Sequence, residues 1–151
     1  MISRQSLIEV ISKSAVLGTT IVFTANIGCL AGAYFITKDK GDIAGLGMIS
    51  ILLIIIGLLD LLAGLIIKAK LLSPLFANPE AVDENMLWQT AFRTTVAIAS
   101  LCLALPLYGL VAVIIDGNMD AMVGFAIASL AGFMFLRLRQ RDFRKLNIPD
   151  G

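Results

Sequence analysis

Four long apolar runs follow one another along the chain, with short polar segments after the first and third runs and a longer mixed segment after the second. The runs cover residues 14–37, 43–67, 94–115 and 119–137. A helix needs about 20 apolar residues, with a range of roughly 17–25, to cross the hydrocarbon core of a membrane. Backbone groups cannot stay unpaired in lipid, so the runs predict helices rather than strands. The pattern therefore predicts an all-α fold, a four-transmembrane-helix bundle of two helical hairpins, in a single membrane domain over residues 1–151.

The first and fourth runs differ from an ordinary span in position or length. The uninterrupted apolar stretch of the fourth covers only residues 121–136, and Met119 and the aliphatic stem of Arg137 complete the crossing. The first run follows a basic N-terminal segment, as in a secretory signal. It is longer than the roughly 7–15 apolar residues of a signal core, so we expect it to remain in the protein as a span.

Composition agrees with a membrane protein. Hydrophobic residues make up 58% of the chain and charged residues 15%, against roughly 45–50% and about 25% in soluble domains. Such a chain offers its apolar side chains to lipid instead of burying them in a private core. We expect an integral membrane protein, located in a bacterial-type cytoplasmic (inner) membrane.

Positive charges are distributed unevenly between the two ends of the predicted bundle. Of the 12 Lys and Arg residues, only Lys38 and Lys40 fall at one end. Cytoplasmic segments of membrane proteins carry an excess of Lys and Arg. Both termini and the middle loop are therefore predicted to be cytoplasmic, and the two short loops to face the other side. The cytoplasmic cations are Arg4, Lys13, Lys68, Lys70, Arg93, Arg137, Arg139, Arg141, Arg144 and Lys145.

The middle segment 68–93 is predicted to be a cytoplasmic interfacial loop. Its first half is rich in Leu and Phe, Pro74 and Pro79 act as helix breakers, and Trp88 is an expected anchor at the membrane interface. The basic C-terminal tail 137–151 is expected to bind anionic lipid headgroups, at about 1 kcal/mol per cation near the surface. The cations concerned are Arg137, Arg139, Arg141, Arg144 and Lys145. Nucleic acid is not an expected partner, because no domain is present to read it.

Small residues recur at helical spacing in three of the runs. Helices in lipid associate where small residues let their backbones approach closely. These positions predict packing faces, either between helices of one bundle or against another subunit, and the sequence leaves both open. They are Gly28 and Gly32 in the first run, Gly57 and Gly64 in the second, and Gly124, Ala128 and Gly132 in the fourth. In the third run, Pro106 removes a backbone donor and predicts a kink, whose freed carbonyl a neighbouring helix or a hydroxyl could satisfy.

Asp60 lies in the middle of the second run, whereas the other carboxylate within the stated bounds, Asp120, lies at the start of the fourth, outside its uninterrupted apolar stretch. A charged side chain at such a position costs roughly 2.5–3.5 kcal/mol on insertion scales and is a functional hypothesis by default. At about 1.5 Å per residue it lies about 10 Å from the cytoplasmic edge, level with Thr20 and Ser100, which are its predicted partners. Two interpretations remain open. Asp60 either forms an interhelical hydrogen bond that fixes the register of the bundle, or it binds an ion or a proton.

Residue types limit the chemistry further. The chain has no His, which removes the commonest general base and the commonest ligand of zinc and haem iron. Cys29 and Cys102 both lie in apolar runs and are interpreted as small buried hydrophobes. Their depths differ by about 10 Å, too much for a disulfide in upright helices. No metal site, cofactor or catalytic constellation is predicted, and we do not expect an enzyme.

The most distinctive segment is Ala104-Leu105-Pro106-Leu107-Tyr108-Gly109-Leu110-Val111. With the two hairpins and the small-residue faces, it resembles the proteolipid ring subunits of rotary ATPases. The resemblance covers residues 97–114 and implies an ion-translocating role. The chain departs from that family where its carboxylate would fall, near Leu103, and Asp60 lies in a different hairpin.

Two functions are predicted from these features. The first is a non-enzymatic accessory or assembly subunit of a larger membrane complex, with membrane lipids and other membrane subunits or further copies of the chain as partners. The alternative is a proteolipid-like ion- or proton-translocating subunit that uses Asp60.

Overall fold

The computed structural model describes residues 3–40, 47–77, 79 and 82–146, apart from the side chains of residues 39, 40 and 145. Four long helices run along one axis: α1 (Arg4–Lys40), α2 (Met48–Ala77), α3 (Glu84–Asp116) and α4 (Met119–Leu136). A short 3₁₀ helix, η2 (Gln140–Leu146), follows α4. All four long helices are long and apolar enough to cross a membrane. The predicted all-α, four-helix membrane fold is confirmed.

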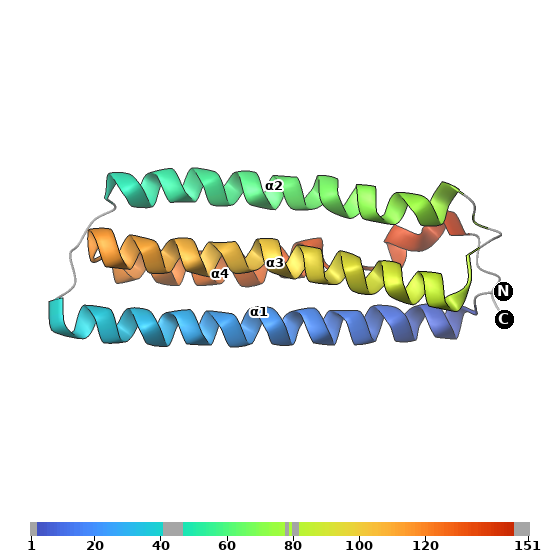
Figure 1. The fold of residues 1–151 in the computed structure, drawn as a ribbon, viewed down its shortest axis with the longest axis horizontal. Coiled ribbons are helices and arrows are strands. Elements are labelled where there is room, and N and C mark those ends of the chain that lie inside the picture. Colours follow the sequence, from blue (N-terminus) through green and yellow to red (C-terminus); the bar gives the residue numbers. More distant parts are fainter. Residues whose placement is uncertain (1–2, 41–46, 78, 80–81, 147–151) are drawn as a thin grey trace.

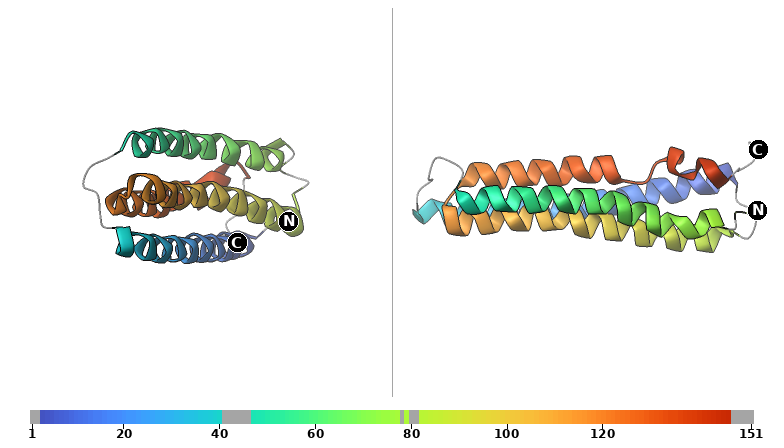
Figure 2. Two further views of the ribbon diagram at one scale, coloured as in Figure 1. Left: turned by 60° about the vertical axis from the view of Figure 1, so that its left-hand side comes forward. Right: turned by 90° about the horizontal axis from the view of Figure 1, so that it is seen from above.

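The helices form an elongated bundle in which α1 and α2 lie on opposite sides of the pair α3 and α4 (Figure 1). Helix α3 packs along α1, α2 and α4, whereas α2 touches α4 over only a short stretch. The beginning of α1 and η2 lie at the same end of the bundle in every view (Figure 2). We call this the terminal end, and the opposite one the turn end.

Burial differs between the outer and inner helices. In the most apolar stretch of each helix, 17% of the residues are buried in α1 and in α2, against 44% in α3 and 50% in α4. Helix α2 buries one narrow stripe in its span, Ser50, Gly57 and Gly64, at seven-residue spacing. The remaining Ile and Leu side chains of α2 are mostly exposed, as expected of a surface whose solvent is lipid.

Local sequence explains the tight turn between α3 and α4. Gly117 has a φ of 68° and caps the end of α3 in the left-handed conformation, which a residue without a Cβ adopts at low cost. Asn118 follows as the N-cap of α4, and its side chain accepts a hydrogen bond from the Ala121 amide. At the terminal end, Asp83 caps α3 in the same way through the Met86 amide. These caps satisfy amides that a helix leaves unpaired in its first turn.

The segment 68–93 is not the loop that the sequence predicted. Helix α2 continues through Pro74 to Ala77, and α3 begins at Glu84. Pro74 has no N–H for the carbonyl of Lys70, and the Ser73 hydroxyl donates to that carbonyl instead, at 2.8 Å. Burial of Leu72, Leu75, Leu87 and Ala91 in a cluster at the terminal end accompanies the extra helical turns. The prediction treated Pro74 as a breaker, because it did not take this burial into account.

The basic tail also folds back onto the bundle. Leu138, Phe143 and Leu146 are buried in the cluster at the terminal end, and Trp88 at the start of α3 is 38% exposed. Arg141 and Arg144 are exposed and Arg137 and Arg139 are half-buried, so only part of the tail faces outward. The Lys145 side chain lies outside the described residues.

Candidate functional site

Asp60 lies half-buried on α2 and accepts a hydrogen bond from the hydroxyl of Tyr108 on α3, at 2.7 Å. The predicted pairing with Thr20 and Ser100 is wrong. Thr20 is exposed on α1, on the far side of α3 from α2, and its hydroxyl donates to the Val16 carbonyl of its own helix at 2.9 Å. Ser100 is also exposed. The depth estimate counted residues along each helix and carried no information on the side of α3 on which α1 and α2 pack.

The direction of helical side chains explains why Tyr108 reaches Asp60. Side chains tilt toward the N-terminus of their helix, so the Tyr108 ring extends from α3 toward the terminal end. The ring forms a T-shaped pair with the ring of Phe125 on α4, with centroids 6.4 Å apart and an interplanar angle of 75°. Gly57, one turn from Asp60, lies beside the ring: a Cβ there would be in ordinary contact with the Tyr108 Cδ2, at 3.9 Å, but would clash with Leu105. The hydrogen bond thus ties α2 to α3.

A second polar cluster, which the sequence analysis missed, joins three helices at the proline of α3. Pro106 has no N–H for the carbonyl of Cys102, four residues earlier. The Ser129 hydroxyl on α4 donates to that carbonyl at 2.7 Å. The amide of Asn26 on α1 donates to the Ser129 hydroxyl at 3.1 Å and to the Val22 carbonyl at 2.8 Å. We call Asn26, Ser129 and the Cys102 carbonyl the polar node.

The polar node is deeply buried. Asn26 is 2% exposed and Ser129 is fully buried. The Asn26 Oδ1 has no hydrogen-bond partner among the described residues. A buried polar group left unpaired costs about 1–3 kcal/mol, so the hydroxyl of Ser129 has a clear structural role. The expectation that a neighbouring helix satisfies the carbonyl freed by Pro106 is confirmed. The signal that could have located the node is an uncharged amide, Asn26, in the middle of an apolar run.

A third contact fixes the turn end of the bundle. The Asp116 carboxylate, at the end of α3, accepts hydrogen bonds from the Ser50 amide at 3.0 Å and the Ser50 hydroxyl at 2.6 Å. Because α2 and α3 are antiparallel, Asp116 lies at the N-terminus of α2, where a negative charge is favoured. Gly47 allows this approach, since a Cβ at that position would clash with the carboxylate. Asp116 therefore acts as an N-terminal cap for α2, supplied from another helix.

The structure separates the predicted packing residues into two groups. Gly57, Gly64 and Gly132 are buried at helix contacts, where an added Cβ would come within 2.5–2.8 Å of a leucine side chain. Gly28 and Gly124 are exposed, and a Cβ on either would have nothing within 4 Å. The first group packs the bundle, whereas the second does not.

Two predicted positions are intermediate, and two packing glycines were missed. Gly32 and Ala128 are half-buried. Gly18 and Gly109 are buried; a Cβ on Gly18 would clash with the Phe133 ring, and a Cβ on Gly109 would approach the Met122 Sδ within 2.7 Å. Neither has a second glycine four or seven residues away, which is why the spacing pattern overlooked them.

At the terminal end, Lys68 holds the tail against α2. Its Nζ lies 2.7 Å from a carboxylate oxygen of Asp142, and it donates to the Arg137 carbonyl at 3.2 Å. The two charged side chains are only 12% and 18% exposed. The same Asp142 oxygen accepts from the Arg139 amide at 2.8 Å, and the Arg139 guanidinium donates to the Met134 carbonyl at 3.0 Å. These contacts anchor η2 next to the end of α4.

The described residues offer no cluster of metal ligands. Within the described part of the chain, no group of three or more His, Cys, Asp or Glu side chains could hold a metal ion. Cys102 is buried and Cys29 is half-buried, and both are free thiols. The polar groups that the fold brings together instead join helices, at Asp60, at the polar node and at Asp116.

Comparison of the chain with protein-family models, with curated proteins and with solved structures gives no match. The likeness of residues 97–114 to proteolipid ring subunits therefore rests on those residues alone.

Proposed function

We propose that this protein is a non-enzymatic accessory or assembly subunit of a larger membrane complex, and that α1 contacts the partner. The observation that carries the proposal is the exposed face of Gly28 on α1, where a Cβ would have nothing within 4 Å. Thr20 and Thr24 precede Gly28 at four-residue spacing and are exposed, and Gly32 follows, half-buried. We call these four residues the α1 small-residue face.

The α1 small-residue face differs from the glycine positions that the bundle uses itself. At Gly57, Gly64 and Gly132 the absence of a Cβ makes room for a leucine of a neighbouring helix. The α1 small-residue face repeats every four residues and has no such neighbour at Gly28. Small residues four apart allow close helix–helix approach in lipid. A helix of another membrane subunit is therefore the partner that we propose, with a second copy of this chain as the other source.

The terminal end is proposed to face the cytoplasm of a bacterial-type inner membrane. The support is the charge distribution: ten of the 12 cations belong to segments at the terminal end, as the positive-inside bias requires. Single-cysteine labelling in intact cells, on a Cys29→Ala, Cys102→Ser background, would test it. Arg144 is exposed, and the thiol of an Arg144→Cys variant should react with an impermeant maleimide only after the membrane is opened. Labelling of that variant in sealed cells would refute the orientation.

Gly28→Leu tests the α1 small-residue face, with Gly124→Leu as the matched control because both positions are open to the outside. We expect the wild-type protein and the control to co-purify stoichiometrically with one membrane partner in mild detergent, and Gly28→Leu to lose it. A wild-type protein that is a stable monomer without a partner would contradict the proposal, as would equal retention of the partner by both variants.

The alternative function is ion or proton translocation through Asp60. One observation favours it: the Asp60 carboxylate is hydrogen-bonded to Tyr108 but only half-buried, so part of it remains accessible. Asp60→Asn should then abolish flux in proteoliposomes and labelling by a carbodiimide. Unchanged flux in that variant would exclude the alternative and leave Asp60 as a link between α2 and α3.

A further inference from the structure

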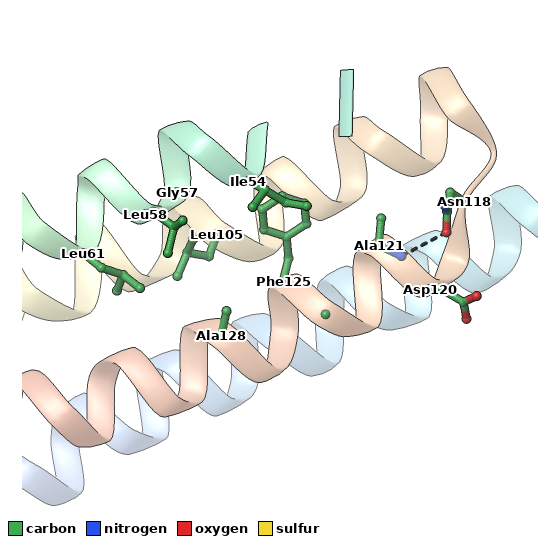
Figure 3. A pocket seen from close by; sticks show the side chains of 11 residues that line it. Ile54, Gly57, Leu58, Leu61, Leu105, Asn118, Asp120, Ala121, Phe125 and Ala128 are labelled. Atoms are coloured by element: carbon green, nitrogen blue, oxygen red, sulfur yellow. Dashed lines mark hydrogen bonds between the residues drawn. The ribbon is translucent and has the colours of Figure 1, made fainter. Parts of the chain in front are cut away.

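An open groove of about 470 Å³ lies between α2 and α4 in the half of the bundle nearer the turn end. Its walls are aliphatic or aromatic, from Ile54 to Leu61 on α2 and from Ala121 to Ala128 on α4, with Leu105 of α3 at the bottom. Figure 3 shows Phe125 and Ala128 pointing from α4 toward α2, with Asp120 at the end of the row. Asn118 and Asp120, at the turn end, are the polar members of the lining.

Small residues create this groove. Gly57 forms part of the α2 wall and Gly124 part of the α4 wall. A Cβ on Gly124 would have nothing within 4 Å, so this glycine opens the groove without taking part in packing between the helices. The helices come together again nearer the terminal end, where Leu61 of α2 packs onto Gly132 of α4. The groove therefore begins at the turn end and closes partway along the bundle.

We propose that this groove binds one acyl chain of a phospholipid whose headgroup carries an ammonium, with Asp120 beside that headgroup. The length of the groove matches one leaflet. Its α4 wall covers residues 118–128, which at about 1.5 Å per residue is about 15 Å. The hydrocarbon core of a membrane is about 30 Å thick, so one leaflet is about 15 Å.

The groove suits one hydrocarbon chain, because its volume of about 470 Å³ lies along about 15 Å of α4 and its lining is apolar except at Asn118 and Asp120. A single hydrocarbon chain can enter, and the walls offer it apolar contact along its length. Water is disfavoured there, because the groove offers polar partners only at its turn end.

Charge complementarity selects the headgroup. Asp120 is exposed at the turn end of the groove, where headgroups begin if the groove spans one leaflet. A carboxylate attracts an ammonium, as in phosphatidylethanolamine, and repels a purely anionic headgroup, as in phosphatidylglycerol. The proposal requires only that the four helices lie in a membrane, and it is independent of the partner proposed for α1.

The test measures lipid retained by the purified protein. The chain is reconstituted in vesicles of equal parts phosphatidylethanolamine and phosphatidylglycerol, extracted in mild detergent and examined by native mass spectrometry. We expect the wild type to retain one phosphatidylethanolamine. Gly124→Leu should lower this retention about tenfold, the loss expected when about two methylene groups can no longer be buried. Gly28→Leu is the matched control and should retain lipid like the wild type.

A second variant separates the headgroup from the chain. Asp120→Asn should still retain a lipid but lose about threefold of its preference for phosphatidylethanolamine over phosphatidylglycerol, as expected for a solvent-exposed charge pair. Phosphatidylethanolamine with a photoreactive acyl chain should label α4 and α2 around the groove and spare the exposed face of α1.

Each contrary result overturns the proposal. Equal lipid retention in the Gly124→Leu and Gly28→Leu variants would remove the groove as the binding site. An unchanged headgroup preference in Asp120→Asn would remove the role of the carboxylate. Labelling spread evenly over all exposed helices would show that the probe reports only bulk lipid. Cross-links from the groove to another protein would show that a protein side chain occupies it. Loss of the α1 partner in Gly28→Leu has no bearing on these results.

Discussion

Replacing Ser129 by Ala tests the polar node most directly. The hydroxyl of Ser129 donates to the Cys102 carbonyl and accepts from the Asn26 amide, so its removal leaves one acceptor and one donor without that partner. All of these groups are buried, and water cannot replace the hydroxyl without entering the bundle.

The expected cost follows from these two groups. A buried polar group left unsatisfied costs about 1–3 kcal/mol, while interhelical hydrogen bonds in membrane proteins average about 0.6 and reach about 1.7 kcal/mol. Because two groups lose a partner at once, we expect Ser129→Ala to lower the free energy of unfolding by about 1–3 kcal/mol. The measurement is reversible unfolding in mixed micelles with increasing dodecyl sulfate, with loss of helical circular dichroism as the signal.

A double-mutant cycle with Pro106→Ala supplies the control. Alanine at position 106 has an N–H that can donate to the Cys102 carbonyl within α3, so the hydroxyl of Ser129 is no longer the sole donor available to it. The cost of Ser129→Ala should then be smaller by about 1 kcal/mol, a coupling typical of residues in one hydrogen-bond network. Equal costs of Ser129→Ala in the two backgrounds would refute the argument that Ser129 substitutes for the amide missing at Pro106.

Three further variants probe separate contacts. Gly18→Ala should lower the free energy of unfolding by about 1–3 kcal/mol, because its Cβ clashes with a buried ring, whereas Gly28→Ala should stay within about 0.5 kcal/mol; equal effects in the unfolding assay would contradict the packing described. Asp142→Asn removes the charge that pairs with the Lys68 ammonium and should release η2, seen as faster cleavage by trypsin after Arg141 and Arg144; an unchanged cleavage rate would argue against this anchor. Tyr108→Phe should cost about 0.5–2 kcal/mol of stability if Asp60 is structural; a fully stable variant would show that the hydrogen bond does not hold α2 to α3.

The sequence by itself determined the four spans and the residue types that they lack. Lipid offers the backbone no hydrogen-bond partners, so the length of each apolar run was enough to predict a helix there. The absence of His and of paired carboxylates in the runs could likewise be read from the sequence without a structure. Sequence also showed that the carbonyl of Cys102 requires a hydrogen-bond donor from outside its own helix backbone, because Pro106, four residues later, has no N–H.

Only the tertiary structure decided which residue supplies each hydrogen bond and each packing contact. Sequence spacing treated Gly28, Gly57, Gly124 and Gly132 alike, but two pack against leucines and two face outward, because packing depends on which side of each helix turns to a neighbour. Likewise, sequence singled out Asp60 as the polar residue within the second span but gave it the wrong partners. Depth is a local property that counts residues along one helix, whereas the side on which α1 and α2 pack against α3 is set by contacts between segments far apart in the chain.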